Sequence, residues 1–289
     1  MPLRARLGAA LFRVTAGPEG PRHRERIHGR PGPRWFDPAS PIGIVHGDAS
    51  MYVGGLRALL LQTLHPAAMT GVSEHSDYRH DMLGRLARTS TFLAVTTFGH
   101  EDDAQQAVNA VRRIHERISG TLPDGSPYAA TDPHLLEWVH VAEIDSFLRA
   151  HQVYGRRPLD QAGRDQYVAQ TAVIARKLGI PRPPTTEAEL ADRIESYRPE
   201  LAATHHAREA VRHVVRKPPL PIAARPAYGV LVAAAVGLLP RWTRKPLRLP
   251  DLPVSERTVV RVLGSAATGT IRWVMSPGRD AARELSDAG

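Results

Sequence analysis

The stretch GRLARTSTFLAVTTFGHEDDAQQAVNAVRRIHERISG, residues 84–120, decides the fold of this chain. An apolar run ends at Gly99 and His100, and a long segment with a 3.6-residue apolar period follows it. Asp102 and Asp103 stand in the first turn of that segment, where the helix dipole favours acidic side chains. The pattern predicts a long amphipathic α-helix that ends close to residue 118.

His115 lies on the apolar side of this predicted helix, together with Val111, Ile114 and Ile118. A buried imidazole needs a partner, which can be a backbone carbonyl, a carboxylate or a metal ion. The residue pattern alone therefore leaves two interpretations open. His115 is either a core histidine held by a hydrogen bond or a ligand of a metal or haem iron.

The rest of the chain has the same helical character, and strand patterns are nearly absent. Helix N-caps are expected at Asp48 or Ser50, at Thr131 or Asp132, and at Thr185 or Thr186, and Gly179 is expected to end a helix. The predicted fold is therefore all-α, a multi-helix bundle. The predicted helices cover residues 50–64, 133–147, 160–178, 186 onward and 199–216.

The N-terminal segment is expected to differ from the bundle. Residues 1–16 are basic and amphipathic, which predicts an arm or a first helix, and residues 17–40 are rich in Pro, Gly and Arg, which predicts extended loop. We expect a largely irregular N-terminal arm over residues 1–41 and a helical domain over residues 42–250. A C-terminal helical extension over residues 251–289 should pack on the same domain.

His140 and Glu143 fall on the apolar face of the predicted helix that follows Asp132. They could form a structural hydrogen bond or stand beside a cofactor. Glu137-x-x-His140 also has the spacing used in di-iron bundles, because residues three apart share a helix face. The matching Glu25-x-x-His28 lies in the Pro- and Arg-rich segment, so a non-haem di-iron oxidase is kept as an alternative.

Composition excludes several kinds of chemistry. The 289-residue chain has no cysteine and 14 histidines, so thiolate metal sites, cysteine nucleophiles and a thiolate-ligated haem are excluded. The formal net charge is +9, which is typical of nucleic-acid binding. No basic motif with interleaved aromatic residues is present, so we expect no nucleic-acid partner.

Residues 210–250 contain eight Arg or Lys and no acidic residue. Within them, the twelve residues Tyr228–Leu239 would span about 18 Å as a helix, which is too short to cross a membrane. This segment is either a buried core helix or a surface helix resting on anionic lipid. We expect a cytoplasmic protein that could also bind a membrane peripherally. A non-catalytic helical module at a membrane surface is therefore kept as an alternative function.

Four motifs follow one another in the chain: LLLQTLHP (59–66), GRLART (84–89), VRRIH (111–115) and DPHLLEWVH (132–140). In this order they resemble the family of bacterial latex-clearing rubber oxygenases and fungal MpaB-type oxygenases, over residues Ile42 to Pro240. The resemblance implies a globin-like helical bundle that holds a b-type haem. It also implies oxidative attack by O₂ on a carbon–carbon double bond of an apolar, isoprenoid-like substrate.

The same resemblance implies roles for individual residues. His115 matches the axial iron ligand, and Arg85 and Thr89 match an Arg-x-x-x-Thr motif beside the haem. Rubber oxygenases carry a Lys before that Thr, whereas here the position is Arg88, whose guanidinium has no lone pair for a metal. Arg85, with Arg88, is expected to pair with the haem propionates.

His140 is expected to line the pocket, so that Arg85, Thr89 and His140 form the expected catalytic set. Rubber oxygenases also have a catalytic Glu upstream of the Arg-x-x-x-Thr motif, and Glu74 is the nearest candidate for it here.

Overall fold

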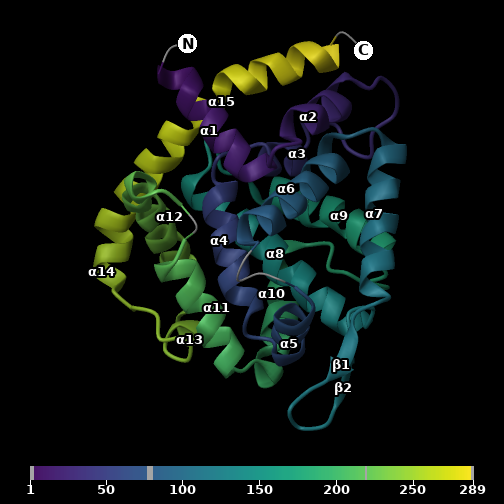
Figure 1. The fold of residues 1–289 in the computed structure, drawn as a ribbon, viewed down its shortest axis with the longest axis vertical. Helices are drawn as coiled ribbons and strands as arrows, with labels where there is room; N and C mark the ends of the chain where they lie inside the picture. Colours follow the sequence, from purple (N-terminus) through teal and green to yellow (C-terminus); the bar gives the residue numbers. More distant parts are fainter. Residues whose placement is uncertain (1–2, 77–80, 219, 288–289) are drawn as a thin grey trace.

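A computed structural model describes residues 3–76, 81–218 and 220–287, which fold into a bundle of helices (Figure 1). The elements in chain order are α1 (Leu3–Ala16), α2 (Gly20–Gly29), α3 (Pro41–His46), α4 (Met51–Gln62), α5 (Pro66–His75), α6 (Met82–Phe98), α7 (Glu101–His115), β1 (Ser119–Thr121), β2 (Pro127–Ala129), α8 (Pro133–Tyr154), α9 (Gln161–Leu178), α10 (Glu187–Ser196), η1 (Arg198–Glu200), α11 (His205–Arg216), η2 (Ile222–Ala224), α12 (Arg225–Leu238), α13 (Arg241–Arg244), α14 (Pro253–Ser255), the π-helical turn η3 (Glu256–Val260) and α15 (Arg261–Asp287).

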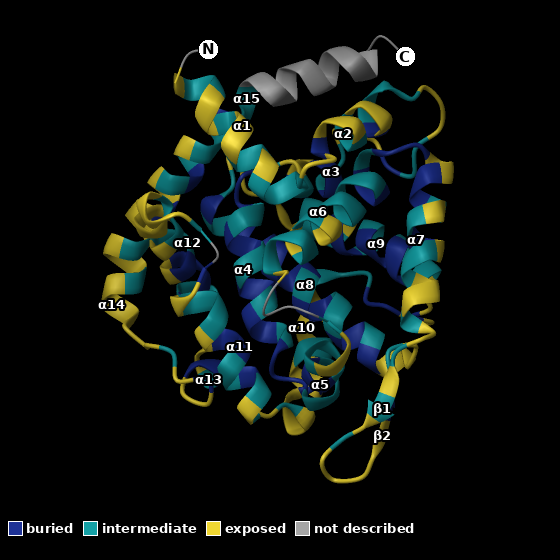
Figure 2. Ribbon diagram, viewed as in Figure 1, coloured by how far each residue is buried: buried dark blue, intermediate teal, exposed yellow. Residues whose placement is uncertain are grey.

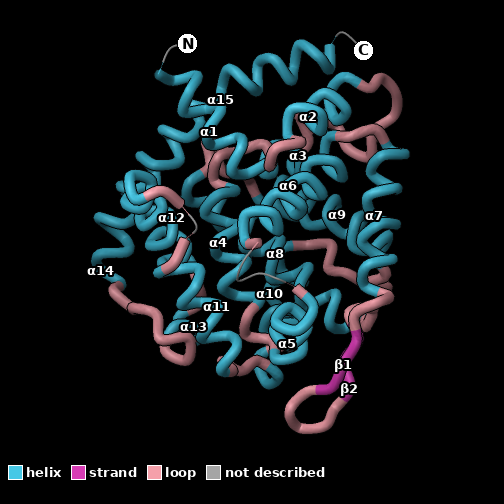
Figure 3. Tube along the Cα trace, in the orientation of Figure 1, coloured by secondary structure: helices cyan, strands magenta, loops and turns pink. Residues whose placement is uncertain are grey.

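The all-α prediction is confirmed, because helices make up most of the described chain (Figure 3). The strands β1 and β2 form one antiparallel hairpin, in which Gly120 pairs with Tyr128. Gly125 turns the hairpin with a φ of +87°, a left-handed conformation that favours glycine. The hairpin projects from the end of the molecule opposite α15 (Figure 1).

Local capping chemistry sets the helix boundaries near the centre of the chain. The side chains of Asp132, Asp160 and Thr186 each accept a hydrogen bond from a backbone N–H in the first turn of α8, α9 and α10. Gly179 ends α9 with a φ of +113°. The predicted stop at Gly179 is confirmed, and Asp132 and Thr186 are the members of their predicted pairs that cap α8 and α10. Ser50 stands before α4 as one of the predicted candidates, but its side chain makes no capping hydrogen bond.

The core is centred on the crossing of α4 with α8, which appears as the buried centre in Figure 2. The helices approach closely at Gly54, where an added Cβ would lie 3.0 Å from Phe147 Cδ1 and 3.2 Å from the Ser146 carbonyl oxygen. A larger residue at position 54 would therefore push the two helices apart.

A buried ion pair spans the same crossing. Arg57 Nη2 lies 2.7 Å from Asp145 Oδ2, and both side chains are at most 5% exposed. Arg57 also donates to Ser146 Oγ at 2.6 Å and to the carbonyl oxygen of Leu238 at 2.9 Å. One guanidinium thus ties α4 to α8 and to the end of α12, and these hydrogen bonds offset the cost of burying the charge.

The prediction of an extended loop over residues 17–40 is wrong, because residues 20–29 form α2. Pro21 stands in the first turn of α2, where its missing N–H is tolerated. Arg26 and Arg30 then reach α7 and donate to Asp103 Oδ1 at 2.6 and 2.9 Å. These long-range pairs hold α2 on the body, so the N-terminal arm is largely helical rather than irregular.

Two further local expectations are corrected. The helix expected to begin at Pro199 begins at His205, because Thr204 supplies the cap and residues 198–200 form a separate 3₁₀ turn. Ile114, expected on the apolar side of α7, is 57% exposed. The buried side of α7 is made by Asp103, Ala104 and Val108.

The C-terminal helix α15 packs against α1, α2 and α12. Figure 1 shows both termini at this end of the molecule. Among the described helices, none is long and apolar enough to span a membrane.

Candidate functional site

Arg85 lies on the N-terminal half of α6, and its guanidinium is withdrawn from water. Burial, followed by the nearby charge of Arg88, lowers the pKa of Arg85. Among the described residues, its hydrogen bond goes to Ser76 Oγ at 3.0 Å. Because a buried cation attracts anions strongly, this guanidinium can receive a carboxylate.

The other residues of the Arg-x-x-x-Thr motif lie further out. Arg88 is 70% exposed, and its Nη1 lies 3.0 Å from Asp81 Oδ2. Thr89, one turn after Arg85 on α6, is exposed. Arg88 thus has an ion pair of its own at the surface, and its part in cofactor binding stays a prediction.

His115 is the last residue of α7 and is partly buried. Burial lowers the pKa of the imidazole, and no charged or hydrogen-bonding neighbour contributes to that change. The ring is therefore neutral at pH 7, with a nitrogen lone pair available to a metal. Of the two interpretations left open by the sequence, a hydrogen-bonded core histidine has no support among the described residues.

His140 and Glu143 lie one turn apart on α8, and burial alone changes the acidity of both. It lowers the pKa of His140 to about 4 and raises the pKa of Glu143 to about 7. His140 Nε2 is buried without a hydrogen-bond partner in the described part of the chain. The sequence left two possibilities for His140 and Glu143, a hydrogen bond between them or a place beside a cofactor. In the described part of the chain this hydrogen bond is absent.

Arg85, His115, His140 and Glu143 share one property: each has lost bulk water, yet each keeps part of its surface accessible. They come from α6, α7 and α8. Helix α6 packs on α7, whereas α8 packs on α4, α9 and α10. Taken singly, His115 can supply a neutral nitrogen ligand, Arg85 a cation and Glu143 a proton-accepting carboxylate. Among the described residues, no hydrogen bond or ion pair joins these side chains to one another.

Glu74, the expected candidate for the catalytic Glu, is held at the surface in a small polar network. Tyr128 of the hairpin donates to Glu74 Oε2 at 2.6 Å, and His75 Nε2 lies 3.2 Å from the same hydroxyl. Glu74 itself is exposed. Its contacts join α5 to β2, and Glu143 is the more deeply desolvated carboxyl.

The di-iron alternative depends on Glu137, whose carboxylate is already engaged. Arg193 forms an ion pair with Glu137, and Tyr197 donates to Glu137 Oε2 at 3.1 Å. Glu25 and His28 lie on α2, a helix that packs on α15, α6 and α1. A carboxylate that is paired with an arginine is a poor iron ligand. The Glu137-x-x-His140 motif is therefore unlike a di-iron site, and the di-iron alternative is disfavoured.

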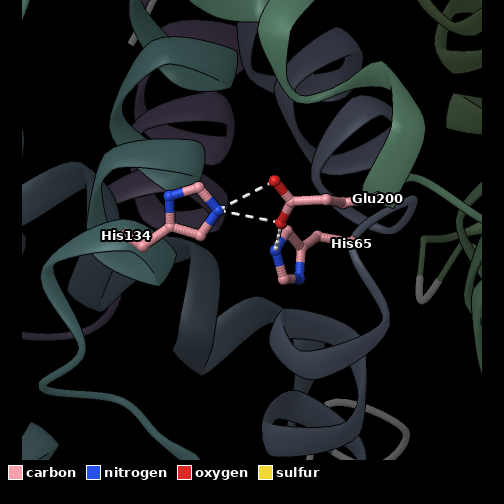
Figure 4. A group of neighbouring side chains, drawn as sticks. All are labelled: His65, His134 and Glu200. Atoms are coloured by element: carbon pink, nitrogen blue, oxygen red, sulfur yellow. Dashed lines mark hydrogen bonds and ion pairs between the residues drawn. The ribbon is translucent and has the colours of Figure 1, made fainter.

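A second group of ligand-type side chains was missed by sequence reasoning. His65, His134 and Glu200 offer atoms that all lie within 4.8 Å of one another, and they come from three separate segments (Figure 4). The signal available in the sequence was the position of His65 directly before Pro66, at the end of an apolar segment.

The basic segment 210–250 is partly neutralised by acidic residues that follow it. Arg244 is buried and pairs with Glu256 at 2.6 Å and with Asp251 at 3.1 Å, and Arg241 pairs with Asp251. Four residues of α12, including Val232 and Val236, are buried. Of the two interpretations, these contacts favour a packed helix.

Comparison with known proteins identifies the family. Residues 44–273 match the family described as the ER-bound oxygenase mpaB/B'/Rubber oxygenase, catalytic domain. The match covers most of the chain, so this protein belongs to that family, and the resemblance carried by the four motifs is confirmed. An oxidoreductase-type enzyme is the general function that the family supports.

Curated relatives add no activity. The chain is 30% identical over 129 residues to the uncharacterized protein Rv2237 of Mycobacterium tuberculosis and, equally, to the uncharacterized protein Mb2261 of Mycobacterium bovis. The alignment covers 43% of this chain and 49% of each relative, so the chain spans about half the length of the curated relatives it matches. No solved structure matches the chain significantly.

Proposed function

We propose that this protein is a haem b-dependent oxygenase that acts with O₂ on an apolar, isoprenoid-like substrate, with His115 as the axial iron ligand. Family membership supports an oxygenase. The observation that carries the proposal is the imidazole of His115, which is partly buried on the helix where the family's ligand is expected and has no hydrogen-bond partner among the described residues.

The side chains that the family resemblance assigns to the haem site suit that cofactor. Arg85 would pair with a propionate, because a desolvated guanidinium binds a carboxylate bidentately. Thr89 lies one turn further along the same helix and would hydrogen-bond at the cofactor's edge. His140 Nε2, which lacks a partner among the described residues, would face the pocket from α8.

When bound, the haem iron supplies the capacity to bind and activate O₂. Placing both oxygen atoms on a carbon–carbon double bond and breaking that bond yields two carbonyl groups, so the reaction balances without an external reductant. Glu143, whose pKa of about 7 leaves it partly ionised at neutral pH, would accept a proton at its carboxylate.

The test combines haem content with substrate-dependent O₂ uptake. The protein is produced with added iron and a haem precursor, haem b is quantified as its pyridine complex, and O₂ consumption is followed with squalene as an isoprenoid probe. We expect one haem per chain and O₂ uptake that requires both haem and squalene. A protein that folds but retains no haem under these conditions would contradict the proposal.

A further inference from the structure

We propose that His65, His134 and Glu200 form a binding site for a divalent transition-metal ion, with Zn²⁺ as the reference ion. The site uses none of the residues assigned to haem binding, so it stands or falls independently of the proposed function.

The three side chains already lie near coordination distances (Figure 4). His134 Nε2 lies 2.8 and 3.1 Å from the two carboxylate oxygens of Glu200, and His65 Nε2 lies 3.8 Å from Glu200 Oε2. Zinc ligands at about 2.1 Å from a tetrahedral ion are separated from one another by roughly 3.4 Å. Small rotations of these side chains would therefore surround an ion.

His65 gives an independent reason to expect a ligand. It is 8% exposed, and neither of its ring nitrogens has a hydrogen-bond partner among the described residues. Buried polar groups are nearly always satisfied. Glu200 Oε2 is too far from His65 Nε2 for a hydrogen bond, and it already faces His134. A metal ion between them would give His65 the partner it lacks.

The surrounding residues orient His134 toward the site. Its ring stacks on Tyr197 with the centroids 4.6 Å apart, and the Tyr197 hydroxyl lies 3.3 Å from His134 Nδ1. The same hydroxyl contacts Glu137, which Arg193 holds in turn. Nδ1 thus has a hydrogen-bond partner, and Nε2 faces Glu200. In metal-binding histidines one ring nitrogen commonly makes such a hydrogen bond while the other binds the metal.

The backbone also preassembles the site. His65 stands between α4 and α5, His134 lies in the first turn of α8, and Glu200 ends η1. Ala202 N donates to the carbonyl oxygen of Leu64 at 2.8 Å, which joins the segment after Glu200 to the residue before His65. A bound ion would therefore cross-link three segments that the fold already brings together.

The donor set indicates the kind of ion. Two imidazole nitrogens and one carboxylate suit Zn²⁺, and the same set binds iron(II) in non-haem oxygenases, so iron(II) is the second ion to compare. Because the side chains of His134 and Glu200 are about half exposed, water can occupy the remaining coordination positions.

The experiment is a calorimetric titration of Zn²⁺ into full-length, tag-free protein freed of metal with EDTA. We expect one zinc per chain, and His134→Ala and Glu200→Gln should each weaken binding at least tenfold. Both substitutions are at accessible side chains, so folding should survive. His205→Ala, a change at an exposed histidine of α11, is the matched control and should bind zinc as the wild type does.

Two further measurements sharpen the result. Co²⁺ bound in place of zinc should give a visible absorption band that is lost in His134→Ala, and His115→Ala should leave zinc binding unchanged. The proposal is overturned if the wild-type protein binds no stoichiometric zinc. It is equally overturned if His134→Ala and Glu200→Gln bind zinc as tightly as the wild type.

Discussion

Replacing Glu143 by Gln should change how the stability of the protein depends on pH. Glu143 lies on α8 near Tyr167, and desolvation raises its pKa to about 7. In the unfolded chain the same carboxyl has a pKa near 4.5. The folded protein therefore holds a proton that the unfolded chain has already released at pH 6.

The sign and size of the effect follow from these two values. Below pH 4.5 the carboxyl is protonated in both states, and as pH rises toward 7 the unfolded state gains by ionising while the folded state does not. The difference corresponds to roughly 3 kcal/mol of stability lost by pH 8. Since Glu143 keeps partial access to solvent, the measured loss should fall below that value. Gln cannot ionise, so the variant avoids the loss.

The assay is urea unfolding of the haem-free protein at pH 5 and pH 8. Glu143→Gln should be clearly more stable than the wild type at pH 8 and close to it at pH 5. Glu116→Gln, at an exposed position of the loop after α7, is the control and should follow the wild type at both values. If wild type and Glu143→Gln lose equal stability between pH 5 and pH 8, Glu143 is hydrated and the reasoning fails.

Three other outcomes are expected. Asp145→Ala should lower the free energy of unfolding by about 3–5 kcal/mol, because it leaves the Arg57 charge buried without its carboxylate; chemical denaturation measures this. Gly54→Val should cost roughly 1–3 kcal/mol in the same assay, since its side chain would press on α8. Arg85→Leu should reduce haem occupancy in a protein of unchanged circular dichroism, whereas Arg182→Leu, at an exposed position, should retain haem. Equal retention by both variants would remove Arg85 from the site.

Sequence reasoning succeeded where structure is set locally. The caps at Asp132 and Thr186 and the stop at Gly179 depend on one side chain or one backbone angle. Neighbouring residues were therefore enough to limit each cap to two candidates and to predict the stop. Helix α2 was missed because Arg26 and Arg30 are held by Asp103, more than seventy residues away. Pro and Gly content predicted loop there, and tertiary contacts decided otherwise.

The candidate site was predictable to a similar extent. The 3.6-residue period placed His115 on the inner side of its helix, yet the same period misplaced Ile114, because α7 buries a narrower face than its apolar residues suggest. The desolvation of Glu143 depends on how α8 packs, which no local pattern reveals. The group of His65, His134 and Glu200 joins positions far apart in the chain, so spacing rules could not find it.

The most direct test of the account is the absorption spectrum of purified His115→Ala beside wild type and His205→Ala, all produced with added iron and haem precursor. The account predicts an intense Soret band in wild type and in His205→Ala, and loss or displacement of that band in a folded His115→Ala protein. An unchanged Soret band in His115→Ala would contradict the assignment of His115 as the iron ligand, and the absence of haem from all three proteins would contradict haem binding itself.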